Sequence, residues 1–286
     1  MIIRSSLAVL ALSAALVALP SSPAAAASVW PAAGQAAYGF GLTGEVHQSG
    51  RVRRAPIASM SKVMTAYLVL RARPLTSSSN GFTMTVSQGD VDDYRRRVAR
   101  GESTVRVVRG EHITERQALA ALLLPSANNI AIMLARRIAG TVSGFVARMN
   151  STAAALHMTH TTYTDPSGFA SSTTSTPADQ LALARTAIRV VELRLMVART
   201  SYWVPVVGWV RNTDTLLGRD GFRGVKTGSM SAAGGCFMFR SRRVVNGRIV
   251  ELIGVVMGQP GRDLVQAGLS AAKRLVDAVA PVAAAP

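Results

Sequence analysis

The chain has 286 residues, of which 49% are hydrophobic and only 5% aromatic, so it is long enough for a substantial core and too apolar to be disordered. Its 32 lysines and arginines exceed its 15 aspartates and glutamates, which gives a formal net charge of +17. Taken alone, this charge is typical of a nucleic-acid-binding protein, but the N-terminus argues against that class.

Residues 1–27 have the pattern of a secretory signal peptide. Arg4 supplies the positive start, residues 7–19 are almost entirely apolar, and Ala25-Ala26-Ala27 fits a small-residue cleavage site. The apolar run is shorter than the roughly 20 residues that a membrane span needs. We therefore predict a soluble, extracytoplasmic mature chain from about residue 28, either secreted, periplasmic or associated with the cell wall.

Export also bears on the partners and on the single cysteine. It predicts no nucleic-acid partner and leaves two explanations of the arginines: a solvated basic surface, or attraction to an anionic polymer or membrane surface of the envelope. One cysteine excludes an intramolecular disulfide. Because Cys236 lies in an apolar stretch, we predict a buried structural thiol.

The N-terminal part of the mature chain predicts a hairpin followed by a helix. Residues 37–46 read as two short strands that turn at Thr43-Gly44. Residues 60–71 have helical spacing of apolar side chains, with Ser59 at the N-terminal end of that helix. Residues 74–80 are rich in turn-forming residues.

The middle of the chain predicts helices. The segment 114–117 has a capping-box pattern and opens a helix over 118–124, which Pro125 ends. After a tight connection, further helices are expected over 129–139 and 141–156. Thr176 and Pro177 are a suitable cap and first residue for a helix that reaches 190 or beyond.

The C-terminal part returns to strands. Residues 225–229, 235–240 and 248–256 are strand-like, Asn246-Gly247 suits a tight turn between the last two, and 262–279 predicts an amphipathic helix on the sheet. Strands at both ends and helices between them predict an α+β fold. We expect an α/β part of about 28–72 and 205–286, with a helical insert of about 73–204.

Three short motifs carry the chemistry. They are Ser59-Met60-Ser61-Lys62, Ser126-Ala127-Asn128 and Lys226-Thr227-Gly228. Ser-x-x-Lys and Ser-x-Asn are weak signals alone, and Lys-Thr-Gly is sharper because the chain has only three lysines. All three motifs in this order, each on a suitable element, form a strong signal.

Lysine at position 62 suits proton transfer. Arginine keeps its proton in proteins, whereas a buried lysine can lose it. Ser59 at a helix N-terminus is placed where developing negative charge is favoured, and Lys62 lies three residues on, along the same face. Burial and the second cation, Lys226, would both lower the pKa of Lys62. We therefore predict that Lys62 is the base that activates Ser59.

The motif order resembles that of penicillin-interacting serine enzymes. The chain is similar to the low-molecular-mass, serine-type D-alanyl-D-alanine carboxypeptidases and transpeptidases (peptidase S11-like) of peptidoglycan metabolism. The resemblance covers most of the mature chain and includes residues 57–66, 122–128, 164–168 and 224–228. It implies a single domain over 28–286 with the β-lactamase/transpeptidase-like fold, in which an antiparallel sheet is flanked by helices and joined to an all-helical subdomain.

The resemblance also implies roles for the motif residues. Ser59 would be acylated by the D-Ala-D-Ala terminus of a peptidoglycan stem peptide, or by a β-lactam that stalls there. Ser126 would relay the proton to the leaving amine, and Asn128 would hold the substrate's peptide carbonyl or Lys62. Lys226 and Thr227 would bind the terminal carboxylate of the substrate, and Gly228 would let the substrate backbone lie against the strand. The backbone N–H groups of Ser59 and Ser229 would form the oxyanion hole.

Two other functions are alternatives to a DD-peptidase. A class A-like β-lactamase needs a glutamate in a Glu-x-x-Leu-Asn loop, but the only glutamate between Asn128 and Lys226 is Glu192, whose neighbours do not match. A non-catalytic, basic cell-wall-binding protein would not need all three motifs intact. No cofactor or metal is predicted, because His157 and His160 lack further ligands and are better explained as the end of a helix.

Overall fold

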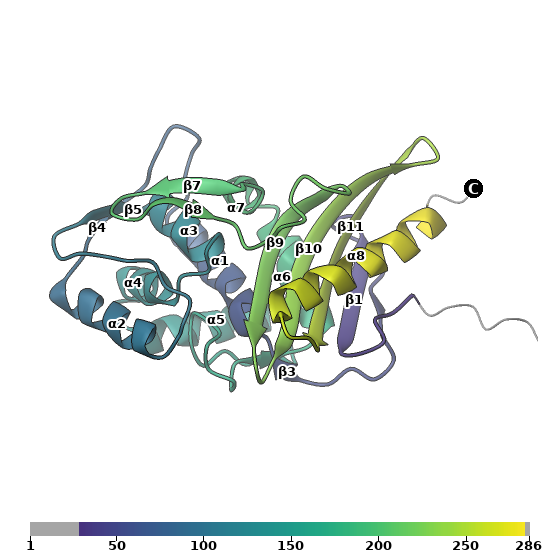
Figure 1. Cartoon of the computed structure of the whole chain (residues 1–286), viewed down its shortest axis with the longest axis horizontal. Coiled ribbons are helices and arrows are strands. Elements are labelled where there is room, and N and C mark those ends of the chain that lie inside the picture. Colours follow the sequence, from purple (N-terminus) through teal and green to yellow (C-terminus); the bar gives the residue numbers. More distant parts are fainter. Residues whose placement is uncertain (1–28, 284–286) are drawn as a thin grey trace, which may run out of the picture.

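The computed structural model describes residues 29–283, so the predicted signal peptide, residues 1–27, lies outside the described residues. At its centre is a five-stranded antiparallel sheet with the order β2-β1-β11-β10-β9 (Figure 1). Strands from both ends of the chain are neighbours, since β1 pairs with β11. The strands are β1 Gln35–Phe40, β2 His47–Gln48, β9 Phe222–Met230, β10 Gly234–Val245 and β11 Arg248–Gln259.

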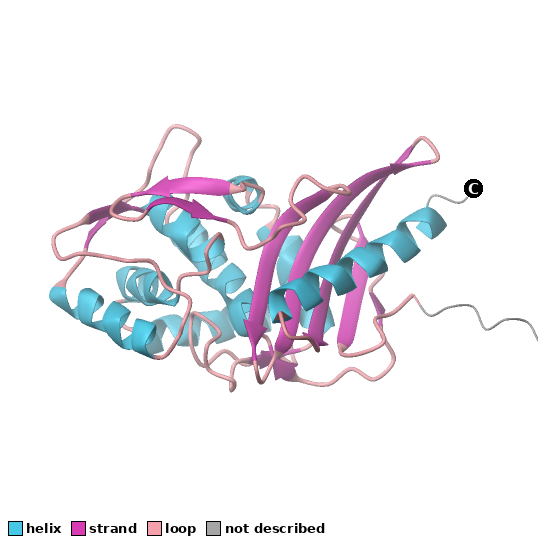
Figure 2. Cartoon of the chain, viewed as in Figure 1, coloured by secondary structure: helices cyan, strands magenta, loops and turns pink. Residues whose placement is uncertain are grey.

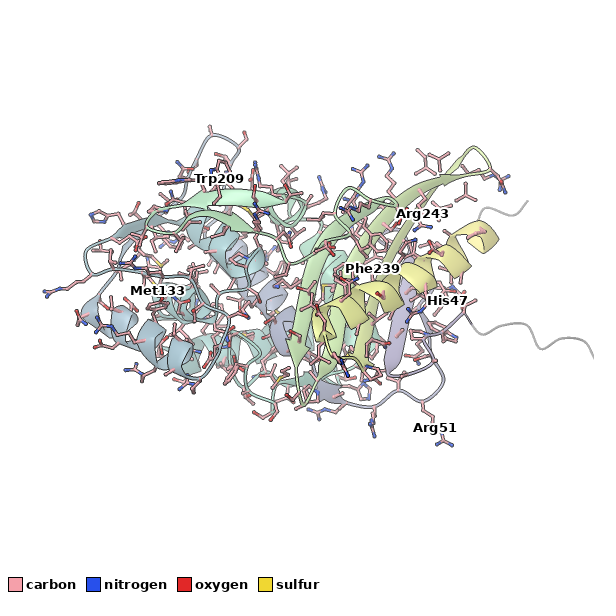
Figure 3. All side chains as sticks on the ribbon, in the orientation of Figure 1. His47, Arg51, Met133, Trp209, Phe239 and Arg243 are labelled. Atoms are coloured by element: carbon pink, nitrogen blue, oxygen red, sulfur yellow. The ribbon has the colours of Figure 1, made fainter. Side chains whose placement is uncertain are left out.

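Alternation along the strands gives the sheet two apolar faces. On β11, Leu252 and Val256 pack with the C-terminal helix α8 (Leu264–Ala283), whereas Ile253 and Val255 belong to the core on the other side. Figures 1 and 2 show α8 running across the sheet, and Phe239, labelled in Figure 3, lies in the core beneath it. A sheet buried on both faces explains why its strands read as nearly continuous apolar runs.

Most of the remaining helices lie beside the sheet (Figure 2), whereas α6 (Pro177–Ala187) packs on its strands β1 and β11. Their caps are local: Thr114 Oγ1 accepts from Gln117 N, and Thr176 Oγ1 accepts from Asp179 N. The helical elements are η1 Ala58–Met60, a 3₁₀ turn, and the α-helices α1 Ser61–Ala72, α2 Gln88–Ala99, α3 Glu115–Leu123, α4 Asn128–Ala139, α5 Val142–Ala155, α6 Pro177–Ala187 and α7 Val191–Val197.

Three two-stranded sheets complete the described fold. They are β3 Ala55–Pro56 with β6 Thr174–Ser175, β4 Thr83–Thr85 with β5 His112–Thr114, and β7 Ser201–Val204 with β8 Gly208–Arg211. The β7–β8 hairpin carries the exposed Trp209, labelled in Figure 3. The α+β expectation, an antiparallel sheet flanked by helices together with a group of helices, is confirmed.

Several predicted boundaries need correction. The N-terminal hairpin does not turn tightly at Thr43-Gly44, because β2 pairs with β1 only through His47 and Gln48 and residues 41–46 form the connection. The helix expected over 118–124 starts at Glu115, since Thr114 itself is the cap. The helix that begins at Pro177 ends at Ala187, and α7 follows as a separate helix.

Helix α2 and the β7–β8 hairpin were not predicted. Within α2 only Val91 and Asp93 are buried, so the helix has almost no apolar stripe to detect. Its available signal was the cap, in which Ser87 Oγ and the Asp90 carboxylate bond to each other's backbone N–H.

The division into an α/β part and a helical insert remains a proposal. Helix α6, inside the expected insert 73–204, packs on β1 and β11, and a boundary at 204/205 would fall at the turn of the β7–β8 hairpin. Across residues 29–283, no single helix is long and apolar enough to cross a membrane; the pair α4 and α5, bent by 85°, passes the same test of length and composition.

Candidate active site

Ser59 lies in the 3₁₀ turn η1, at the entrance to α1 and against β9. The turn begins with Ala58 in a left-handed conformation (φ 47°), which costs energy for a residue with a side chain. Gly168 packs against it so closely that a Cβ there would lie 1.8 Å from the Ala58 carbonyl oxygen. The loop around Gly168 therefore supports the strained turn that presents Ser59.

Lys62 is the best-placed base in the site. Its Nζ donates to Ser59 Oγ at 2.8 Å and to the Ser167 carbonyl oxygen at 2.8 Å, and the residue is 0% exposed. Burial, and then the nearby cation Lys226, hold the pKa of Lys62 well below its ordinary value, although Asp165 and Glu102 oppose them. A lysine that is neutral at moderate pH can accept the proton of the Ser59 hydroxyl.

Asp165 shapes the loop that holds Lys62. Its Oδ1 accepts from the backbone N–H groups of Ser167 and Gly168, and its Oδ2 accepts from that of Ala170. Burial alone would raise the pKa of Asp165, but hydrogen bonds from Ser167, Ala170 and Gly168 outweigh it and lower the pKa. The segment 165–168 was part of the family resemblance, but no role was predicted for it. Its sequence, Asp-Pro-Ser-Gly, is typical of turns in which the Asp side chain accepts from nearby backbone N–H groups.

The second motif places two buried polar groups at the start of α4. Ser126 adopts a left-handed conformation (φ 70°), and its buried Oγ has no hydrogen-bond partner among the described residues. Asn128 is the first residue of α4, and its backbone N–H donates to the Ser103 carbonyl oxygen at 2.8 Å. Its Nδ2 donates to Glu102 Oε2 at 2.8 Å, a contact that sequence reasoning did not anticipate.

The third motif lies on β9. Lys226 is 1% exposed, its Nζ donates to the Thr227 carbonyl oxygen at 3.0 Å, and Thr227 Oγ1 shares a hydrogen bond with Thr213 Oγ1. Burial lowers the pKa of Lys226 to about 7 and raises that of nearby Asp214 to about 6. For both groups burial outweighs their mutual attraction, so a second anion entering the site would favour the charged form of Lys226.

Gly228 and Ser229 complete the edge of the site. A Cβ on Gly228 would lie 3.1 Å from both Ser59 N and Ile57 O, so glycine lets β9 approach η1 closely. Ser229 is exposed and lines the same cavity as Ser59.

The cavity in front of Ser59 has a volume of about 500 Å³. Asn128 and Ser229 line it, whereas Lys62, Ser126, Lys226 and Thr227 are buried and are not among its lining residues. Glu102 and Phe169 are among the lining residues that the sequence did not predict. No signal in the sequence marked Glu102, since it belongs to no motif.

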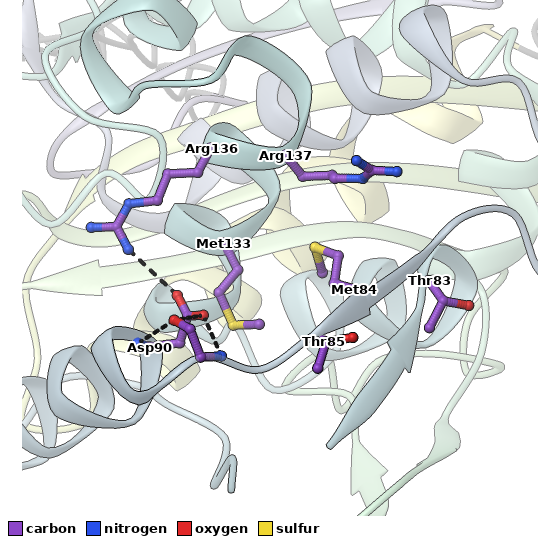
Figure 4. Close-up of a pocket in the computed structure, with 8 residues that line it drawn as sticks. Thr83, Met84, Thr85, Asp90, Met133, Arg136 and Arg137 are labelled. Atoms are coloured by element: carbon purple, nitrogen blue, oxygen red, sulfur yellow. Dashed lines mark hydrogen bonds and ion pairs between the residues drawn. The ribbon is translucent and has the colours of Figure 1, made fainter. Parts of the chain in front are cut away.

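Another cavity, of about 340 Å³, lies between β4, α2 and α4 and contains none of the motif residues (Figure 4). Its acidic group, Asp90, already caps α2 and pairs with Arg136 at 3.4 Å. Within residues 29–283 there is no group of three or more His, Cys, Asp or Glu side chains that could hold a metal ion. His157 lies in the turn after α5, and Cys236 is buried with a pKa raised to about 12 by burial.

The fold, with Lys62 buried beside Ser59, is similar to solved structures of the DD-transpeptidase class. The Streptomyces K15 DD-transpeptidase aligns with a TM-score of 0.75 and 25% identity, covering 87% of this chain and 97% of that one. An evolved penicillin-binding protein homologue from Mycobacterium tuberculosis aligns with a TM-score of 0.75 and 28% identity, covering 93% and 97%.

Sequence comparisons identify the family. Residues 43–261 match the model of Peptidase_S11, D-alanyl-D-alanine carboxypeptidase, and the chain belongs to this family. A D-alanyl-D-alanine endopeptidase of Escherichia coli (strain K12) is 30% identical over 210 residues, 69% of this chain and only 62% of that protein. A D-alanyl-D-alanine carboxypeptidase of Streptomyces sp. (strain K15) is 31% identical over 208 residues, 66% of this chain and 69% of that protein.

Proposed function

We propose that the chain is an exported serine DD-peptidase. It acts on the D-Ala-D-Ala termini of peptidoglycan stem peptides through a Ser59 acyl-enzyme, as a carboxypeptidase, a transpeptidase or both. The observation that carries the proposal is the 2.8 Å contact between Lys62 Nζ and Ser59 Oγ at the cavity, with a lysine whose pKa is strongly lowered by burial. Membership of the D-alanyl-D-alanine carboxypeptidase family supports the substrate class.

Acylation is proposed to use Ser59, Lys62 and Ser126. Neutral Lys62 takes the Ser59 hydroxyl proton as Oγ bonds to the carbonyl carbon of the penultimate D-alanine, and the N–H groups of Ser59 and Ser229 stabilise the oxyanion. The C–N bond then breaks, and the leaving D-alanine takes a proton that Ser126 relays from Lys62. Water or an acceptor amine afterwards attacks the ester and regenerates Ser59.

Lys226 and Thr227 are proposed to bind the terminal carboxylate of the substrate. A carboxylate beside Lys226 would raise the lysine's pKa from about 7 and hold it charged, so binding and protonation favour each other. The same groups would receive the carboxylate of a β-lactam, which would acylate Ser59.

The alternatives are less well supported. Glu192, the only glutamate between Asn128 and Lys226, is paired with Arg116 at 2.7 Å and does not line the Ser59 cavity. A non-catalytic cell-wall-binding protein would have no reason to bury Lys62 against Ser59, because an unpaired buried lysine costs stability.

The location and remaining partners are also proposals. Family membership supports an extracytoplasmic site of action on the cell wall. The arginine-rich surface is proposed to hold the protein near anionic envelope polymers, and no nucleic-acid partner is proposed. If this attraction operates, salt should weaken binding to isolated cell walls.

Mass spectrometry of products from a D-Ala-D-Ala-terminated peptide tests the activity. Free D-alanine is expected, together with an adduct of the acceptor if an amine is supplied and transpeptidation occurs. A fluorescent penicillin should label the protein covalently, and Ser59→Ala should abolish both results. Release of no D-alanine under either condition would refute the proposal.

A further inference from the structure

Glu102 is an anion buried in the wall of the Ser59 cavity. Its side chain is 0% exposed and is held by two cations from the end of α2 and the loop that follows. Arg97 Nη1 lies 2.6 Å from Oε2, and Arg100 Nη2 lies 2.6 Å from Oε1. Arg97 in turn pairs with Asp93 at 2.7 Å. Two arginines pair with this carboxylate, so Glu102 places an anion at the edge of the site.

This carboxylate determines which way the Asn128 amide faces. Glu102 Oε2 also accepts a hydrogen bond from Asn128 Nδ2 at 2.8 Å. An ionised carboxylate can only accept hydrogen bonds, so it selects the amide nitrogen and turns the amide oxygen away. Asn128 Oδ1 is buried and has no hydrogen-bond partner within the described part of the chain. A buried acceptor without a donor is costly, and this one lies beside the cavity that Ser59 faces.

We propose that Glu102 is a positioning residue for acyl transfer, which makes Asn128 present its amide oxygen to an N–H donor. The inference rests on the proposed function. Two donors carry the required chemistry: a peptide N–H of the stem peptide, and the Lys62 ammonium that forms when Ser59 loses its proton. Lys62 has three donor positions when protonated, and Ser59 Oγ and Ser167 O account for two of them.

A second effect of Glu102 is electrostatic. Its charge raises the pKa of Lys62 and so opposes burial and Lys226. Removing the charge should shift the acid limb of the acylation rate toward lower pH, which a purely structural residue would not do. Glu111 offers a matched control, because its carboxylate is also partly buried but accepts from Val108 N and is not among the charges that shift the pKa of Lys62.

Exchanging the two side chains provides the sharpest test. Asn128→Asp places two carboxylates together and should slow acylation of Ser59 by a fluorescent penicillin about 10- to 100-fold, the range of a lost hydrogen bond to a charged group. Glu102→Gln lets the Asn128 amide turn over and should also slow it. The double variant Glu102→Gln/Asn128→Asp restores one donor and one fixed acceptor, and keeps one negative charge in the pair. It should recover most of the lost rate.

Steady-state kinetics of the single variants distinguish the two possible N–H donors. If the donor is a substrate N–H, the single variants should raise KM for the stem peptide; if it is the Lys62 ammonium, they should lower kcat and change its pH profile. Thermal unfolding identifies variants that do not fold. If Glu102→Gln does not fold, Glu102→Asp replaces it, because this variant keeps the charge but its side chain is too short to hold Asn128. The inference is overturned if folded Glu102→Gln reacts like the wild type and Glu111→Gln, or if the double variant stays as slow as Asn128→Asp. Failure of the wild-type protein to react would instead refute the proposed function.

Discussion

Lys62 Nζ lies 2.8 Å from Ser59 Oγ, although no part of Lys62 reaches solvent. A helix brings residues three apart to the same face, so the contact itself is local. Lys62 can act as a base because burial lowers its pKa and so favours its neutral form. Position 62 therefore needs an amine that can lose its proton.

Lys62→Arg should reduce acylation of Ser59 about 10²- to 10⁴-fold, the usual contribution of a general base, because the guanidinium stays protonated. Lys226→Arg should keep measurable acylation, since a cation for the carboxylate remains. Lys273→Arg, on the exposed face of α8 beside Asp277, is the matched control and should behave as the wild type. Rates of penicillin labelling measure all three, and equal losses in Lys62→Arg and Lys226→Arg would contradict the assignment of roles.

The pH dependence of kcat/KM should be bell-shaped. On the acid side, activity rises with pH as Lys62 loses its proton, at a pH well below that of an ordinary lysine. On the basic side, activity falls above about pH 7 as Lys226 in the free protein loses the charge that attracts the carboxylate. A substrate whose terminal carboxylate is amidated should react more slowly and lack the basic limb. Activity that stays level from pH 7 to 10 would exclude this role of Lys226.

Burial of Lys226 should lower the free energy of unfolding at pH 7. Its pKa is 10.5 in the unfolded chain and about 7 in the folded one, so the unfolded state binds more protons between these values and stability rises with pH across that window. Lys226→Met should remove much of this rise and stabilise the protein at pH 7 by about 1–4 kcal/mol, as replacement of buried charges often does. Urea unfolding at pH 7 and 9 measures both effects, and destabilisation at pH 7 would show that the lysine is better compensated than its burial indicates.

Gly168→Ala should destabilise the protein and slow acylation. A Cβ at Gly168 would overlap the Ala58 carbonyl oxygen, whereas one at Gly247, with a similar positive φ of 74°, would meet nothing within 4 Å. Gly247→Ala therefore measures the backbone cost alone, roughly 1–2 kcal/mol. Gly168→Ala should lose clearly more, with a lower rate of penicillin labelling in the fraction that folds. Equal losses in the two variants would mean that the loop does not support the Ser59 turn.

Elements governed by short-range rules could be predicted from the sequence. The side chains of Thr114 and Thr176 cap their helices by accepting hydrogen bonds from backbone N–H groups three residues further on. Asn246-Gly247 takes positive φ at both residues in the turn that joins β10 and β11. Helix α2 was not predicted because it buries almost nothing. The β7–β8 hairpin was not predicted because its two exposed tryptophans, Trp203 and Trp209, weaken the expected alternation.

At the site, the residue types, their order and the Ser59–Lys62 spacing can be predicted from the sequence, since these depend on chain chemistry and helix geometry. Which groups surround them depends on the packing of distant segments. The Ser167 carbonyl reaches Lys62 across 105 residues, and Glu102 reaches Asn128 across 26. Such contacts depend on how loops and helices pack, and burial of Lys62, which sets its pKa, is a property of that packing rather than of the motif.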